Sequence, residues 1–510
     1  MELIISKIDV LFINADSSAA AYQSLAIDFA AIEPPTWSLL LANSMRAVGF
    51  SCAILDATAE GLSHEQSVQK VIDLNPKLAV FVVYGQNPNS GTINMVGNIE
   101  CVNLLKIAAP NIKTCFVGSH TSALPIEVLN NSAIDIILLN EGVYALRNLL
   151  ASNLDSDLNK IKGIGHKKDG KPVLNPPELV VPTEKMDIDL PGYAWDLLPM
   201  KVKPLDLYKA HFWHTEYKQE NRSPFAAIYT SLGCRFKCDF CMINIVNRVD
   251  NSSNITSSHS PNMRFWSPQF MLTEFEKLVS LGVEHIRISD EMFFLNQRYF
   301  EPLLEGIVER DLKLKMWSYT RVDTVRERYL DLFKKAGINW LALGIEAGNR
   351  EVRREVSKGT FQLDDISSVV KLVQQHDIGV AANYIFGFPE DTFETMQQTL
   401  DLAIELNTEM ANFYPFQALP GSPLHLKAKE EAWALPDTYQ GYGFLSYEAT
   451  PMATKYVSAE DVVRFRDNAW RTYHQNPIFL DLIKRKFGED ALSGVLNLAK
   501  VKLKRRILGD

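Results

Sequence analysis

The chain has 510 residues, a length that is typical of about three domains. Hydrophobic residues make up 46% and charged residues 22%, a composition that is typical of a folded globular protein and excludes a disordered or fibrous chain. The formal charge of −9 provides no basic surface for a nucleic-acid backbone, and no apolar run reaches membrane-spanning length. Residues 1–14 lack the features of a secretory signal. We therefore expect a cytoplasmic protein that does not bind nucleic acid.

Strand-like apolar runs alternate with helical stretches through residues 1–150, a pattern typical of a parallel sheet covered by helices. A helix is expected after Pro34-Pro35, where apolar residues recur at helical spacing until Gly49. The predicted strands span 9–13, 53–55, 78–83, 114–117 and 134–138. Residues 1–150 are thus predicted to form a Rossmann-like α/β domain.

In such a sheet a ligand lies over the carboxyl ends of the strands. The loops at that edge are rich in Gly, Ser and Asn, and their many small hydrogen-bond donors suit a large polar cofactor better than a single phosphate. No G-x-G-x-x-G follows the first strand, which disfavours a nicotinamide or flavin dinucleotide. The alternative is that these loops are only surface turns. Residues 151–215 contain several prolines and one candidate hairpin at 168–170, and we expect them to be a linker.

Three of the six cysteines, Cys234, Cys238 and Cys241, lie in one short loop after a predicted strand at 225–229. Three thiolates in such a loop can hold a four-iron cluster and leave one iron open to another ligand. They can also contribute to a zinc site together with His211 or His214. Zinc is the weaker alternative, because no fourth cysteine lies nearby and C-x3-C-x2-C is not a common zinc spacing.

This spacing, with Phe240 before the last cysteine, resembles the cluster motif of the radical S-adenosylmethionine (SAM) superfamily. The resemblance implies that Cys234, Cys238 and Cys241 ligate a [4Fe-4S] cluster and that Phe240 contacts a cofactor. It also implies that the open iron binds SAM, whose cleavage gives a 5′-deoxyadenosyl radical.

The second half of the chain again alternates strands and helices. The predicted strands span 225–229, 284–289, 313–319, 340–345, 381–386 and 412–416. Six units are fewer than the eight of a closed barrel, so we expect a partial (β/α)6 TIM-like barrel over 216–425, which matches the fold of the radical SAM family. Asp290, Glu291, Arg321 and Glu346, at strand ends, resemble residues of the family that contact SAM, although Asp290 or Glu291 could instead cap a helix.

Pro34-Pro35 before a helix, together with 54–57, 118–121 and 140–142, resembles the cobalamin-binding domain that precedes many radical SAM proteins. The two resemblances cover roughly residues 1–425. The implied cobalamin contacts are Asn87, Ser90, Thr92, Gly118, Ser119, His120, Thr121, Ser122 and Glu141. The D-x-H-x-x-G signature is absent, so the lower face of the cobalt has no assigned ligand. His64 and His120 are available, but we expect each to be a surface histidine.

A carbon radical can remove hydrogen from a carbon that side-chain bases cannot deprotonate. The paired resemblances therefore imply a radical C-methyltransferase that uses methylcobalamin. The alternatives are cyclisation, rearrangement or other alkyl transfer; methylthiolation, for which Cys52, Cys101 and Cys115 would have to hold a second cluster; and a non-catalytic, zinc-stabilised binding protein. Tyr319, Tyr384 and Tyr414 are candidates for proton handling at the substrate, and each could instead be a packing residue.

Residues 426–510 are predicted to form a small helical domain. Its basic runs at 484–486 and 504–506 suit either an anionic membrane surface or the solvated face of a packing helix, and we expect the second. The expected partners are a small-molecule or lipid- or sugar-linked substrate and an electron donor such as flavodoxin or ferredoxin. The protein is expected to be a monomer.

Overall fold

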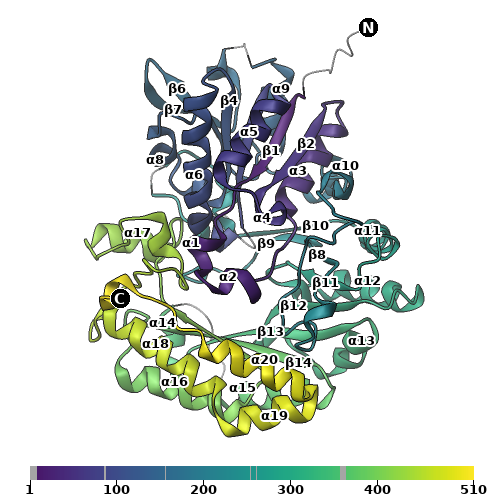
Figure 1. The fold of residues 1–510 in the computed structure, drawn as a ribbon, viewed down its shortest axis with the longest axis vertical. Coiled ribbons are helices and arrows are strands. Elements are labelled where there is room, and N and C mark those ends of the chain that lie inside the picture. Colours follow the sequence, from purple (N-terminus) through teal and green to yellow (C-terminus); the bar gives the residue numbers. More distant parts are fainter. Residues whose placement is uncertain (1–7, 86–87, 155–156, 253, 260, 357–362) are drawn as a thin grey trace.

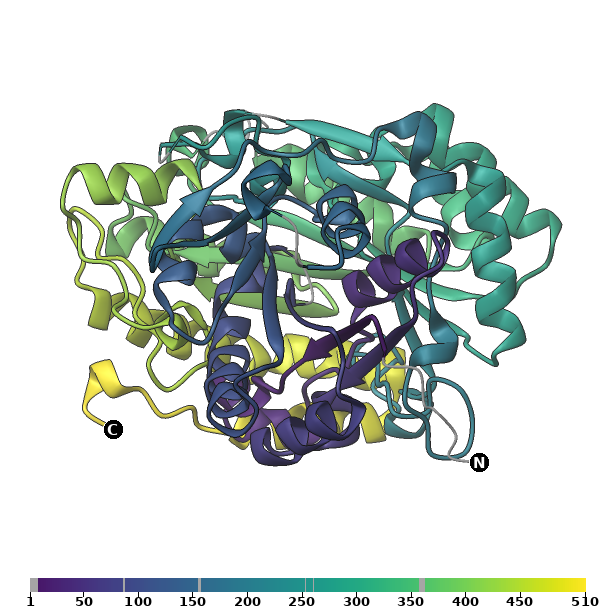
Figure 2. The ribbon, with the colours of Figure 1, turned by 90° about the horizontal axis from the view of Figure 1, so that it is seen from above.

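The computed structural model describes residues 8–85, 88–154, 157–252, 254–259, 261–356 and 363–510. Two sheets organise the molecule: the first half of the chain forms the upper part and the second half forms the lower part, with the C-terminal helices along the bottom (Figure 1). Seen from above, the first half lies over the second (Figure 2).

The first sheet has seven strands in the order β2-β1-β3-β4-β5-β6-β7. Its first five strands are parallel and confirm the five predicted ones: β1 (Val10–Asn14), β2 (Cys52–Asp56), β3 (Leu78–Val83), β4 (Lys113–Gly118) and β5 (Ile136–Leu138). β3 is buried along its whole length, which explains why it is a continuous apolar run. The order 2-1-3-4-5 is that of a doubly wound sheet.

Helices cover both faces of this sheet. α5 (His64–Leu74), α6 (Gly91–Ala108) and α8 (Pro125–Asn130) pack on one face, and α3 (Thr36–Arg46) and α9 (Val143–Ala151) pack on the other. α3 is the helix predicted after Pro34-Pro35. The short helices are α1 (Ser18–Tyr22), α2 (Leu25–Asp28), α4 (Ala57–Glu60) and α7 (Ser119–Ala123).

The hairpin at 168–170 corrects the prediction that 151–215 is only a linker. β6 (Ile164–Lys168) and β7 (Lys171–Leu174) pair antiparallel and extend the first sheet beyond β5. After α10 (Met186–Asp189), Tyr193, Trp195 and Tyr208 are buried in the core that the two halves share. The prolines of this segment indicated an extended path, but its aromatic residues are what fix it between the sheets.

The second sheet has six parallel strands in the order β15-β14-β13-β12-β11-β8 and confirms the partial barrel. The strands are β8 (Phe225–Ile228), β11 (His285–Ile288), β12 (Lys315–Arg321), β13 (Ile338–Glu346), β14 (Gly379–Phe386) and β15 (Met410–Pro415). The helices between them are α11 (Pro268–Ser280), α12 (Gln297–Glu309), α13 (Leu330–Lys335), α14 (Arg350–Glu355), α15 (Leu363–Gln375) and α16 (Phe393–Leu406). A two-stranded antiparallel sheet, β9 (Ser231–Cys234) and β10 (Asn262–Phe265), follows β8.

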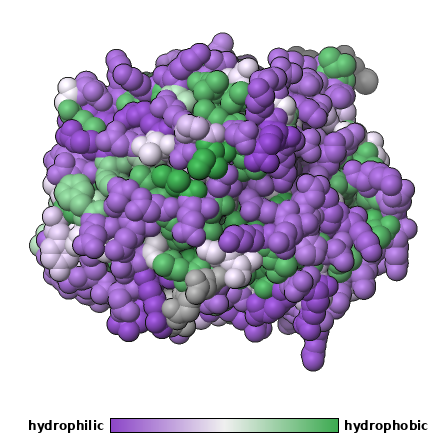
Figure 3. Space-filling model, turned by 90° about the horizontal axis from the view of Figure 1, so that it is seen from below, coloured by the Kyte–Doolittle hydropathy of each residue, from purple (hydrophilic) through white to green (hydrophobic). Residues whose placement is uncertain are grey.

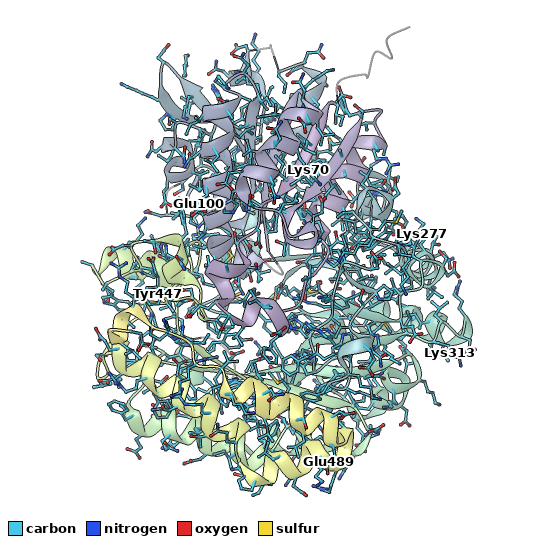
Figure 4. The ribbon with its side chains drawn as sticks, viewed as in Figure 1. Lys70, Glu100, Lys277, Lys313, Tyr447 and Glu489 are labelled. Carbon is cyan, nitrogen blue, oxygen red and sulfur yellow. The ribbon has the colours of Figure 1, made fainter. Side chains whose placement is uncertain are left out.

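The C-terminal part is helical, with α17 (Pro423–Glu430), α18 (Ala459–His474), α19 (Pro477–Phe487) and α20 (Glu489–Lys500). The last residues return to the first half of the chain, where the Lys504 amide donates to Gln23 Oε1 at 3.1 Å. Tyr447, labelled in Figure 4, donates to the Asp510 carbonyl at 2.9 Å. These bonds hold the end of the chain across the lower half of the molecule.

The basic run at the end of α19 is paired with acids, as expected for a packing helix. Lys484 lies 2.7 Å from Glu489, Arg485 lies 2.7 Å from Asp481, and Lys486 lies 2.9 Å from the buried Glu409. The lower face of the molecule is mostly hydrophilic, with apolar side chains gathered near its middle (Figure 3). Within the described ranges, no helix combines the length and the apolar character needed to cross a membrane.

Candidate functional site

A cavity of about 670 Å³ lies between the carboxyl edges of the two sheets. The first half of the chain contributes the ends of β1 and β2 and the loop after β3. The second half contributes the cysteine loop and the interior of the partial barrel, and the C-terminal part contributes residues of α18 and α20. The first sheet, the partial barrel and the C-terminal helices therefore line one common space.

The first sheet meets the cavity at the point where its strand order reverses, between β1 and β3, which is the usual ligand position in a doubly wound sheet. Asn14, at the end of β1, and Asn98 of α6 both line the cavity. Asn14 Nδ2 and Asn98 Oδ1 are buried and have no hydrogen-bond partner among the described residues. Such amide groups match the carboxamides at the rim of a cobalamin, so the residues present fit that cofactor.

Most of the predicted cobalamin contacts lie elsewhere. Ser90 lines the cavity, and Asn87 lies outside the described residues. The cavity lining does not include the other predicted residues, Thr92, Gly118, Ser119, His120, Thr121, Ser122 and Glu141, so their contacts with cobalamin stay predictions. These residues are buried under the cavity edge, where the Ser122 hydroxyl accepts from the Asn140 amide at 2.9 Å.

Both histidines considered for the lower face of cobalt are engaged within the first domain. The ring nitrogens of His64 contact the Asp16 carbonyl at 2.9 Å and Glu100 at 2.9 Å. Those of His120 contact Thr92 Oγ1 at 3.0 Å and Glu127 at 3.3 Å. Neither side chain lines the cavity. Two contacts on each ring make both histidines structural residues.

Glu141, the last predicted cobalamin contact, joins the two halves of the chain. Its carboxylate lies 2.7 Å from the Arg264 guanidinium of β10 and accepts from the Val181 amide, and both charged side chains are buried. Its carbonyl accepts from Trp37 Nε1 at 3.2 Å. These contacts fix the β9–β10 hairpin, and with it the cysteine loop, relative to the first sheet.

The three cysteines line the cavity from the β9 end and the loop that follows it. Side chains hold that loop from behind: Asn244 bonds both the amide and the carbonyl of Cys234, at 3.1 and 2.8 Å, and Ser257 donates to the Cys241 carbonyl at 2.5 Å. Burial and the neighbouring Cys238 raise the pKa of Cys241 well above its usual value, so metal binding there must displace a proton.

Arg321, at the end of β12, and Phe240, in the cysteine loop, both line the cavity. The Arg321 guanidinium lies 3.9 Å from the centre of the Phe236 ring and pairs with Asp323 at 2.8 and 2.9 Å. Its Nη1 lies 3.9 Å from Cys238 Sγ. A fixed positive charge beside the thiolates offsets the negative charge of a cluster.

The two carboxylates after β11 have different positions. Asp290 does not line the cavity; it accepts from the Thr230 amide and hydroxyl at 2.5 and 2.7 Å and from the Ser231 hydroxyl at 2.5 Å, which corrects its assignment as a SAM contact. Glu291 lines the cavity, and its Oε1 has no hydrogen-bond partner within the described residues. Burial raises the pKa of Glu291 to about 7, although the positive charge of Arg287 acts to lower it. A buried, unpaired carboxylate fits the amino group of SAM.

Glu346, at the end of β13, also lines the cavity. Its φ of +68° and the register shift between Gly344 and Glu346 turn the strand end at this residue. A non-glycine residue in that conformation is strained, and such strain is typical of functional sites. The position therefore fits the cofactor contact that the sequence predicts.

Of the three tyrosines, Tyr319 and Tyr414 line the cavity, whereas Tyr384 faces away from it. Tyr384 stacks on Phe413 with ring centres 5.4 Å apart, and its hydroxyl is buried without a partner in the described structure. The alternation of β14 explains the difference, because Ala381, Asn383 and Ile385 take the inward positions. The prediction for Tyr384 as a substrate-facing residue is wrong.

Sequence reasoning missed the amides inside the barrel. Asn412 and the Tyr414 hydroxyl both donate to Asn383 Oδ1, at 3.1 and 3.2 Å. The alternation of side chains along β14 and β15 predicts that these residues share one face of the sheet. It does not predict which face of the sheet borders the cavity. Small residues at Ala342, Gly344 and Ala381 leave the space that the amides border.

The model of the B12 binding domain matches residues 22–150, and that of the radical SAM superfamily matches residues 228–403. The chain is 26% identical over 487 residues to the anaerobic magnesium-protoporphyrin IX monomethyl ester cyclase of Rubrivivax gelatinosus, covering 92% of this chain and 78% of that protein. It is 23% identical to the uncharacterized methyltransferase PH0819 of Pyrococcus horikoshii, covering 87% of this chain and 88% of that protein.

The fold is similar to that of a solved structure in which cobalamin and a [4Fe-4S] cluster are both bound. The structure of the radical SAM methyltransferase TsrM from Kitasatospora setae, with cobalamin and a [4Fe-4S] cluster bound, superposes with a TM-score of 0.64. The match covers 89% of this chain and 84% of that chain at 17% identity. The chain therefore combines a B12-binding domain over residues 22–150 with a radical SAM domain over residues 228–403.

Proposed function

We propose that the protein is a cobalamin-dependent radical SAM enzyme that methylates an unactivated carbon of a small molecule. The observation that carries this proposal is the single cavity into which the β1/β3 edge of the B12-binding domain and the cysteine loop of the barrel both open. An enzyme that uses two cofactors on one substrate needs them in one dry space.

In this proposal Cys234, Cys238 and Cys241 hold the [4Fe-4S] cluster, and Glu291 and Glu346 bind the amino end of SAM. Asn14 and Asn98 bind the rim of cobalamin. When bound, the cluster with SAM supplies a 5′-deoxyadenosyl radical and the cobalamin supplies a methyl group.

The chain's own residues position the substrate and keep water out. Asn383 and Asn412 offer amide groups to a polar part of the substrate, because the small residues beside them leave room in the barrel. Tyr319 and Tyr414 line the same space and can hold or pass a proton at their hydroxyls. Trp213 and Trp317 also line the cavity, with ring centres 5.1 Å apart, and their packing excludes water from that wall.

Cyclisation is the second candidate, because the relative from Rubrivivax gelatinosus is a cyclase. It would use the same cofactors without consuming a methyl group. Labelled methyl in the product separates the two reactions.

The test is anaerobic reconstitution with iron, sulfide, hydroxocobalamin and SAM labelled in its methyl group, reduced by dithionite or by flavodoxin. We expect 5′-deoxyadenosine and labelled methylcobalamin. If 5′-deoxyadenosine does not form even with a strong reductant, the radical assignment is wrong.

The cysteine assignment is tested by Cys238→Ala, with Cys101→Ala as its control. Cys101 is buried in α6 and does not line the cavity. We expect Cys238→Ala to abolish 5′-deoxyadenosine formation while cobalamin stays bound, and Cys101→Ala to keep both. SAM cleavage by Cys238→Ala at the wild-type rate would contradict the ligand assignment.

A further inference from the structure

Part of the cavity wall comes from the C-terminal helices and lies outside the two family domains. Arg466, Asp467, Trp470 and Arg471 of α18 line it together, because residues spaced by about one helical turn share a face. The end of α20 and the segment after it add apolar residues to the cavity wall, Leu498, Val501 and Leu503. Figure 1 shows α18 and α20 running side by side beneath the barrel.

A buried charge cluster on this wall has more positive than negative groups. Asp467 lies 2.8 Å from Arg466 and 2.9 Å from Arg505, whose side chains are 6% and 1% exposed. Both arginines lower the pKa of Asp467, which is therefore a carboxylate. Two guanidinium groups against one carboxylate leave one positive charge in excess, and a buried charge without a partner is costly.

The remaining donors of Arg505 are used within the protein, at the Phe444 and Ser446 carbonyls, at 3.0 and 2.9 Å. Arg466 donates its Nε to the Phe413 carbonyl at 2.6 Å and its Nη1 to Asp467 at 2.8 Å. Its Nη2 donates to no described residue, although the side chain lines the cavity. Arg466 thus lines the cavity and keeps one donor that no described residue uses.

Arg471 adds a second cation to the same wall. Its Nη2 donates to Asn468 at 2.6 Å, and it forms no ion pair with any residue that the structure describes. Guanidinium groups with free N–H bonds bind the oxygens of carboxylates and phosphates in a fixed geometry. The acids that the cavity contains besides Asp467 include Glu33, which is paired with Arg287 at 2.6 Å.

We propose that Arg466 and Arg471 form an oxyanion-binding subsite, and that the substrate is a small molecule with a carboxylate or phosphate group on an apolar body. The inference rests on the proposed function, since it assigns the substrate class of the same cavity. The oxyanion neutralises the charge excess of the Arg466–Asp467–Arg505 cluster, and the apolar body lies along Leu498, Val501 and Leu503. The other end of the substrate then extends toward the cysteine loop.

The subsite is tested by binding, with the full-length protein loaded with cluster and cobalamin. Equilibrium dialysis measures the binding of two probes, 8-anilino-1-naphthalenesulfonate and the neutral N-phenyl-1-naphthylamine. The two share an apolar body and differ only in the sulfonate group. The variants are Arg466→Gln and Arg471→Gln. The matched control is Arg464→Gln, an arginine of the same helix that is 57% exposed and does not line the cavity.

Arg466→Gln and Arg471→Gln are each expected to weaken binding of the sulfonate about tenfold and to leave the neutral amine unchanged, because one charge-assisted hydrogen bond is lost. Arg464→Gln should change neither. Equal sulfonate binding by Arg471→Gln and the wild type, or an equal loss of both probes, overturns the proposal. Arg471→Gln decides alone if Arg466→Gln does not fold, since Arg471 is only half-buried.

Displacement of the bound sulfonate by octanoate, octyl phosphate and octanol identifies the oxyanion. We expect one of the two anions to displace it at least about ten times better than octanol, and the stronger one identifies a carboxylate or a phosphate. Octanol as effective as both anions contradicts the subsite. None of these readouts needs radical chemistry, so failure of the proposed function, seen as missing 5′-deoxyadenosine, is a separate result.

Discussion

Two adjacent carboxylates after β11 have different tasks because their surroundings differ. Asp290 is fully buried and accepts hydrogen bonds from Thr230 and Ser231, which begin the path into the cysteine loop. Glu291 faces the cavity with one unpaired oxygen. Asp290 is thus a positioning residue for the loop, and Glu291 is the proposed SAM contact.

Asp290→Asn and Glu291→Gln separate these tasks. We expect Asp290→Asn to lower the free energy of unfolding by about 1–3 kcal/mol, because its amide group cannot accept all three bonds. Glu291→Gln should leave stability unchanged or raise it, and should weaken SAM binding roughly tenfold in equilibrium dialysis. Unchanged SAM affinity in Glu291→Gln would refute the contact.

Asp56, at the end of β2, makes the stability of the first domain depend on pH. Burial raises its pKa to about 7, although bonds from the Ala59 amide and the Tyr208 hydroxyl act in the opposite direction. A carboxyl with a raised folded-state pKa favours folding fully below its unfolded pKa of 3.8, and this contribution is lost as the pH rises through about 7.

Asp56→Asn should therefore remove a pH dependence. Relative to the variant, we expect the wild type to lose up to about 4 kcal/mol of stability between pH 4 and pH 8, since one pKa unit corresponds to about 1.4 kcal/mol. Unfolding midpoints of both proteins across this range measure the difference. A constant difference between the two would mean that Asp56 is ionised throughout.

At the scale of elements, the β9–β10 hairpin positions the cysteine loop. Its position relative to the first sheet depends on the buried pair between Arg264 of β10 and Glu141, which follows β5. The hairpin is short, so pairing between its own strands contributes little to stability, and the contact to the other half of the chain determines its direction.

Glu141→Gln should destabilise the protein by about 3–5 kcal/mol, because it leaves the Arg264 charge buried without a partner. The double variant Glu141→Gln with Arg264→Met should recover most of that loss, since no charge remains. We expect Glu141→Gln also to lower the iron content after reconstitution. A single variant as stable as the wild type, with full iron content, would show that the pair does not orient the hairpin.

At the scale of the whole molecule, the cavity makes the two halves depend on each other. Its walls come from the first sheet, the barrel and the C-terminal helices, and the last residues of the chain bond Gln23 of the first half. A ligand that fills this space binds only when all three walls are in place.

Hydroxocobalamin should therefore stabilise the entire chain. At a concentration about 100 times its dissociation constant, we expect a gain of about 2.7 kcal/mol, seen as a shift of one common thermal transition. Circular dichroism and tryptophan fluorescence should report the same midpoint. A shift confined to an early transition, with the barrel unfolding at its original temperature, would show that cobalamin contacts the first domain alone.

Local patterns in the sequence were enough to predict the two α/β sheets, eleven of their strands, the partial barrel and the cysteine loop, because alternation, apolar runs and the C-x3-C-x2-C spacing involve residues close together in the chain. Among the predicted site residues, Ser90, Glu291 and Arg321 line the cavity, and their cofactor contacts stay predictions.

Which polar residues reach the cavity depends on how the elements pack together and could not be predicted from local patterns. Gly118 to Ser122 end a strand at the expected edge but are covered by their own neighbours, and Tyr384 lies on the outer face of β14. Asn14, Asn98, Asn383 and Arg466 come from four different elements, and no spacing along the chain relates them. A cavity is formed by side chains that are distant in sequence, so its lining depends on packing between elements and not on the pattern within any of them.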